Sequence, residues 1–108
     1  MYHQRNPRNH MLTIKQIYNL AVDLGIKSDL RGQAIVKRKL ERVKKHYQEL
    51  NQKQKAEFDL ERLTNPFSDT RYFGNPNKQV KRILTGIDID VAELLLAKEL
   101  ERVGKAPD

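Results

Sequence analysis

The apolar residues between positions 13 and 63 of this 108-residue chain recur every three or four positions, which is the period of an amphipathic helix. Residues 13 to about 24 form one such stretch, and Gly25 predicts its end because glycine readily takes the left-handed conformation at a helix C-terminus. Residues 33 to about 50 form a second, and Asn51 is a natural N-cap for a third that runs to about Leu63. The sequence therefore predicts three helices, the last two paired as an antiparallel hairpin.

We expect the first helix to bury the face that its regularly spaced apolar residues define. Those residues are Ile14, Ile17, Leu20, Ala21 and Leu24.

From residue 64 the pattern changes to that of strands followed by a buried helix. Residues 71–73 favour a short strand, residues 74–77 are turn formers, and Val80–Ile89 is apolar on both faces, so we expect a β-hairpin that leads into one long, doubly covered strand. Val91–Val103 is apolar on nearly all sides, which is typical of a buried helix. The expected fold class is α+β, with these elements forming part of an α/β domain.

The apolar strand and helix predict a division of the chain. We expect residues 1–10 to be a disordered arm or an upstream extension, and residues 11–63 to be a helical region. Residues 64–108 would supply the β-hairpin and first βα unit of an incomplete α/β domain. The helix at 91–103 would then be covered by protein that the 108 residues do not include, so we expect an amino-terminal fragment of a larger domain.

Composition narrows the class of protein. With 38% hydrophobic and 32% charged residues, the chain supports one domain with a modest core. It has no cysteine, which excludes disulfides and thiolate metal sites and favours a reducing, cytoplasmic location. No apolar run approaches the ~20 residues of a membrane span, so no membrane partner is expected.

The formal net charge of +7 lies entirely in the first half of the chain. Residues 1–50 carry 11 Lys and Arg against 4 Asp and Glu, whereas residues 51–108 carry 10 of each kind. Lys37, Arg38, Lys44 and Lys45 on the second predicted helix are therefore candidate contacts for nucleic acid. Their positions spread around the helix instead of lining one stripe, which favours a solvated face over an interface.

Two polar groups in the second half are candidate sites. Asp88 and Asp90 lie at the carboxyl end of the predicted strand, where open α/β sheets place ligands. Asp90 with Glu93 also fits a capping box for the last helix, and this interpretation is the stronger one for Asp90.

A polar loop cluster precedes the predicted hairpin, and it comprises Asn65, Ser68, Asp69 and Arg71. Its side chains suit a phosphate or carboxylate, but they suit hydrogen bonds to their own loop better. The sequence offers no catalytic residue set, no metal-ligand set and no glycine-rich phosphate loop.

Three segments resemble the opening of the NGG-interacting-factor-like family: IYNLAVDLGIKSDLRG (17–32), FDLERLTNPFSDTR (58–71) and VKRILTGIDIDVAELLLAKEL (80–100). The resemblance implies an α/β protein that forms ring-like oligomers and binds a pair of divalent metals, often labelled a type 2 GTP cyclohydrolase homologue. It also implies that the metal ligands lie further along, because no position here matches one. We therefore expect no cofactor in this chain and no catalysis by it alone.

The function expected is that of an amino-terminal part of a metal-binding protein of this kind, which self-associates through the Leu94–Leu100 helix. The alternative is a stand-alone basic helical module that binds RNA or an acidic protein partner.

Overall fold

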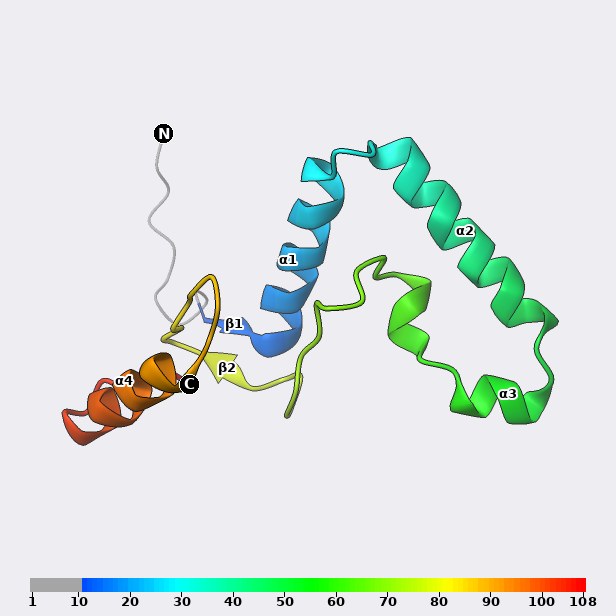
Figure 1. The fold of residues 1–108 in the computed structure, drawn as a ribbon. Coiled ribbons are helices and arrows are strands. Elements are labelled where there is room, and N and C mark those ends of the chain that lie inside the picture. The colour runs from blue at the N-terminus through cyan, green and yellow to red at the C-terminus, as the bar shows by residue number, and fades with distance from the viewer. Residues whose placement is uncertain (1–10) are drawn as a thin grey trace. The chain divides into compact units, whose positions relative to one another are not determined.

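The computed structural model describes residues 11–108, and the arm predicted at residues 1–10 lies outside this range. The described residues form two compact units, one made of residues 15–74 and the other of residues 11–14 with 75–108. The fold is rich in helix and carries a small two-stranded antiparallel sheet, as Figure 1 shows. The mixed α and β content predicted from the sequence is therefore confirmed at this level.

Helices α1 (Ile14–Ser28) and α2 (Gln33–Glu49) are joined by a tight turn. The turn is held by Asp29, whose carboxylate accepts bonds from the backbone N–H of Arg31 at 2.9 Å and from its guanidinium at 2.7 Å. This pairing lowers the pKa of Asp29 to about 2. Gly32 then takes a φ of 89°, which side chains disfavour, and α2 begins at the next residue.

The predicted end of the first helix at Gly25 is wrong, because α1 continues to Ser28. Gly25 serves a packing purpose instead. A Cβ at this position would lie 2.7 Å from the Cε2 atom of the Phe67 ring, so the absence of a side chain lets the ring pack against the helix backbone.

The third predicted helix is divided in two. α3 (Gln52–Glu57) begins as expected at Asn51, whose side chain accepts the N–H of Gln54 at 2.8 Å in a reciprocal capping box. The chain then leaves the helix, and Asp59 accepts the N–H of Glu61 at 3.1 Å to cap a separate 3₁₀ turn, η2 (Leu60–Leu63). Two capping side chains within eight residues thus give two short helices in place of one.

The core of the 15–74 unit lies where η2 and the loop after it enter the space between α1 and α2, as Figure 1 shows. Val36 of α2 is fully buried, and Tyr18 and Val22 of α1 are 7% and 8% exposed. The face of α1 that was expected to be buried is not the one that is covered, since Leu20 and Leu24 remain 52% and 62% exposed. The loop that packs on α1 determines which residues of this helix are buried.

In the other unit, β1 (Leu12–Thr13) pairs antiparallel with β2 (Gln79–Val80), with Leu12 opposite Val80. The Ile14 N–H extends this pairing by donating to the Lys78 carbonyl at 3.0 Å. Residues 71–73 form no strand, so the predicted hairpin between residues 71–73 and the strand that begins at Val80 is not confirmed. The partner of β2 comes instead from the start of the described chain.

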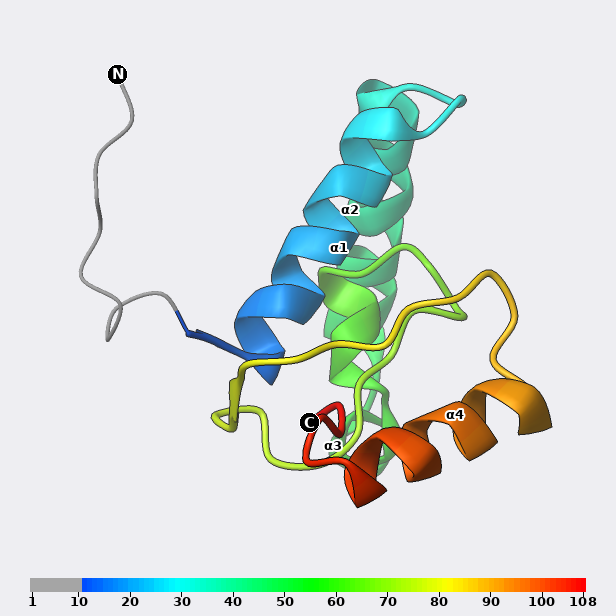
Figure 2. The same cartoon turned by 90° about the vertical axis from the view of Figure 1, so that its left-hand side faces the viewer.

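The long strand predicted at Val80–Ile89 is also not confirmed, because strand pairing stops at Val80. The N–H groups of Lys81 and Arg82 donate to the Asp108 carboxylate at 2.6 and 3.0 Å. Within the described residues no strand lies beside residues 83–89, and an extended segment without a neighbour cannot form a ladder. Figure 2 shows this segment running without regular structure into α4 (Val91–Arg102).

We predict that Gly25→Ala destabilises the 15–74 unit by about 1 kcal/mol. The clash with Phe67 costs ~1–3 kcal/mol, and the higher helix propensity of alanine offsets ~0.5–1 kcal/mol of it. Urea unfolding followed by circular dichroism measures the change. In a Phe67→Leu background the same substitution should cost less, and an equal cost in both backgrounds would contradict the packing role of Gly25.

Candidate functional site

Asn65 is the centre of a hydrogen-bond network in the 15–74 unit, and it is only 3% exposed. Its Nδ2 group donates to the Tyr18 hydroxyl at 2.9 Å and to the Thr70 carbonyl at 2.7 Å, and its Oδ1 atom accepts the Phe67 N–H at 2.8 Å. The side chain therefore joins α1 to both ends of the loop that follows η2.

Arg71 stabilises the same loop, and each of the three guanidinium nitrogen atoms has a partner. Its Nη1 donates to the Phe67 carbonyl at 2.9 Å and to the Thr70 carbonyl at 3.0 Å, while Nη2 pairs with Asp59 at 3.0 Å and Nε with Glu61 at 3.3 Å. Of the predicted polar loop cluster, Asn65 and Arg71 thus bind their own loop. Ser68 and Asp69 are exposed beside them.

Tyr18 completes this network, and it is not among the site residues predicted from the sequence. Its hydroxyl donates to Glu61 Oε2 at 3.3 Å, its ring meets Tyr72 edge-on at 5.1 Å between centroids, and the Lys15 ammonium lies 4.9 Å from the ring centroid. Burial is the main cause that raises the pKa of Tyr18 above its usual value. The spacing of Tyr18 four residues before Val22 was the available signal for this buried face.

The two strand-end acids have different environments. Asp90 caps α4, because its carboxylate accepts the Val91 N–H at 2.7 Å and its own N–H donates to Glu93 Oε2 at 2.9 Å. Asp88 is exposed in the segment before the helix. In the described part of the chain, no three His, Asp or Glu side chains are placed to share a metal ion.

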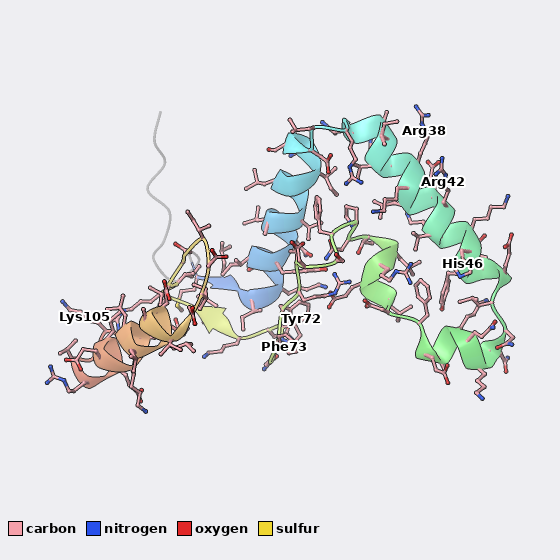
Figure 3. The ribbon with its side chains drawn as sticks, viewed as in Figure 1. Arg38, Arg42, His46, Tyr72, Phe73 and Lys105 are labelled. Carbon is pink, nitrogen blue, oxygen red and sulfur yellow. The ribbon has the colours of Figure 1, made fainter. Side chains whose placement is uncertain are left out.

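The predicted nucleic-acid contacts lie on α2 and are all exposed: Lys37, Arg38, Lys44 and Lys45. Lys39 and Arg42 add two more exposed cations to the same helix, and Figure 3 shows Arg38 and Arg42 projecting away from it. None of these six side chains has a salt-bridge partner among residues 11–108. The basic charge of α2 is therefore available to an external anion.

Helix α4, for which we expected cover from protein outside the 108 residues, exposes most of its apolar residues. Leu94 and Leu95 are 63% and 64% exposed and Leu96 is 49% exposed, and no residue of the helix is buried. Only Glu93, Ala97 and Leu100 are partly covered, and they share one side at helical spacing. The remaining apolar surface has no cover within the described residues.

We predict that Asn65→Ala destabilises the chain by about 2–3 kcal/mol, because it leaves the Phe67 N–H without a partner and removes one bond each from the Tyr18 hydroxyl and the Thr70 carbonyl. Chemical unfolding measures the change. Asp69→Ala is the matched control on the exposed part of the same loop and should change stability by less than ~0.5 kcal/mol. Equal stability of the two variants would contradict the central role of the Asn65 amide.

No family model, no curated protein and no solved structure matches the chain. None of the helices between residues 11 and 108 combines the length and the apolar content that a bilayer span requires. The functional assignment therefore depends on the exposed apolar surface of α4, on the cations of α2 and on the polar network around Asn65.

Proposed function

We propose that the chain acts as an assembly element of a larger α/β protein of the metal-binding, NGG-interacting-factor-like kind, and does not catalyse a reaction by itself. The exposed apolar surface of α4 carries this proposal. A water-soluble helix normally turns such residues toward protein, so Leu94, Leu95 and Leu96 are suited to docking against a sheet or a second helix.

The start of α4 supports the same proposal. Asp90 and Glu93 form a complete capping box, so the helix is built to begin at Val91 regardless of what covers it. A capped helix with an uncovered apolar surface is a preformed docking element, since little conformational entropy remains to be lost when a partner surface binds it. In this proposal the metal ligands lie in the rest of the larger protein, as the family resemblance implies.

When the 108-residue chain is alone, a second copy is the nearest source of cover for α4. Burying a whole leucine side chain contributes ~1.5–3 kcal/mol. About half of the Leu95 and Leu96 side chains is still exposed, so covering both contributes about 2 kcal/mol per helix. That value corresponds to a ~30-fold change in the dissociation constant for each helix, or to roughly 1,000-fold for the two helices of a dimer.

We therefore predict concentration-dependent self-association of the chain, measured by sedimentation velocity. The Leu95→Lys/Leu96→Lys variant should weaken it ~30-fold or more. Leu30→Lys is the control, because Leu30 is a fully exposed leucine in the turn between α1 and α2. If the unsubstituted 108-residue chain stays monomeric at high concentration, the docking role is wrong. If the purified chain holds stoichiometric zinc, manganese or iron, the placement of the metal ligands outside this chain is wrong.

The six unpaired cations of α2 favour a second candidate function, the binding of RNA. A cation that contacts a phosphate releases a counterion from the RNA, so binding weakens as salt is added. For a single strand, a plot of log binding constant against log salt concentration has a slope of ~−0.7 for each neutralised phosphate. The two functions use different surfaces and are separately testable.

For RNA binding we predict that Lys37→Gln/Arg38→Gln/Lys44→Gln lowers the salt slope by about 2, measured by fluorescence anisotropy with a single-stranded oligonucleotide. The control removes three charges from the other unit through Lys78→Gln/Lys98→Gln/Lys105→Gln. Binding that is absent at low salt, or a slope that falls equally in both triple variants, would rule out α2 as the RNA surface.

A further inference from the structure

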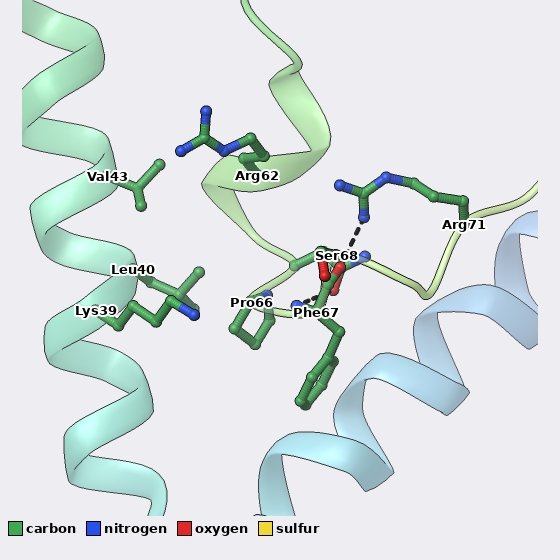
Figure 4. Close-up of a pocket in the computed structure, with 9 residues that line it drawn as sticks. Lys39, Leu40, Val43, Arg62, Pro66, Phe67, Ser68 and Arg71 are labelled. Carbon is green, nitrogen blue, oxygen red and sulfur yellow. Dashed lines mark hydrogen bonds between the residues drawn. The ribbon is translucent and has the colours of Figure 1, made fainter.

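A pocket of about 230 Å³ opens in the 15–74 unit between α2, η2 and the loop that follows, shown in Figure 4. Its cationic lining comes from three elements, with Lys39 on α2, Arg62 on η2 and Arg71 at the end of the loop. Its apolar walls include Leu40 and Val43. The pocket thus combines positive charge with an apolar floor.

The charges in this pocket are compensated unequally. Arg71 is paired with Asp59 at 3.0 Å and Glu61 at 3.3 Å, so most of its charge is already balanced. Lys39 and Arg62 have no salt bridge among the described residues, and no Asp or Glu lines the pocket. Two unbalanced cations that face one hollow favour an anion between them.

The guanidinium of Arg62 lies near an aromatic ring. Its guanidinium carbon lies 5.1 Å from the centroid of the Phe58 ring, a distance at which the ring attracts the cation. Figure 4 shows the Arg62 side chain extending toward α2 on the side of Val43. The contact with Phe58 therefore leaves the N–H donors of the Arg62 guanidinium available to a ligand.

We propose that this pocket binds a small phosphate monoester. Such an ester carries close to two negative charges at neutral pH, which matches the unbalanced charges of Lys39 and Arg62. The guanidinium of Arg62 can donate two parallel bonds to the phosphate oxygens, and the exposed Ser68 hydroxyl in the lining can donate a third. The organic part of the ester packs against Leu40 and Val43.

The volume of the pocket limits the size of the ligand. Sites for drug-sized molecules usually measure ~300–1,000 Å³, and this pocket is smaller. It therefore suits one phosphate group with a compact organic body. This inference is independent of the assembly role, because all of its residues lie between positions 39 and 71 and none belongs to α4.

Titration calorimetry of the complete 108-residue chain tests the proposal with inorganic phosphate and phenyl phosphate as probes. We expect saturable binding of both, with phenyl phosphate the tighter ligand because its ring contacts the apolar walls. Amide resonances of residues 62–71 should shift during the titration. Benzoate provides a carboxylate on the same ring and should bind more weakly, since it carries a single charge.

Arg62→Gln and Lys39→Gln should each weaken phenyl phosphate binding about tenfold, the usual effect of losing one charged hydrogen bond. Lys45→Gln is the matched control, because Lys45 lies two residues beyond Val43 and so ~200° around the helix. It should change the affinity less than twofold. Equal weakening by all three variants, absence of saturable binding at millimolar phosphate, or tighter binding of benzoate would each overturn the phosphate site.

Discussion

The burial of one amide group determines the arrangement of the 15–74 unit. Asn65 is almost wholly removed from water, and an amide in that position is tolerated only when its donors and acceptor are bonded. The required partners are the Tyr18 hydroxyl and two backbone groups of the loop, so the loop must lie against α1. This requirement brings Phe67 onto Gly25 and sets which side of α1 is covered. The small apolar core around Val36 then fills the remaining space.

The elements that the sequence predicted well are those specified within a few residues. Asn51 with Gln54 and Asp90 with Glu93 each form a reciprocal capping box, and both ends of the interaction are visible in the sequence. The helical apolar spacing of residues 33–50 also predicted α2, and its cations lie on the solvated face expected for them. The polar loop cluster was predicted to bind its own loop, and Asn65 and Arg71 do so.

The features that could not be predicted depend on partners far away in the chain. Gly25 resembles a helix end until Phe67, 42 positions later, is known to pack on it. Val80–Ile89 has the composition of a buried strand, but a strand forms only beside another. The Asp108 carboxylate also binds the N–H groups of Lys81 and Arg82, which a ladder would use. The pocket unites residues from three elements, and only the fold brings Lys39 near Arg62.

The two units differ in the kind of surface that they leave uncovered, and this difference follows from how each is stabilised. In residues 15–74 the acids Asp59 and Glu61 pair with Arg71, whereas Lys39 and Arg62 have no salt bridge among the described residues. In residues 75–108 the side chains of Asp90 and Glu93 cap the start of α4, and the leucines of its middle turns are exposed. The ligand of the first unit requires positive charge, whereas a partner of the second requires apolar surface. An anion can therefore bind the first unit without competing with a protein that covers the leucines of the second.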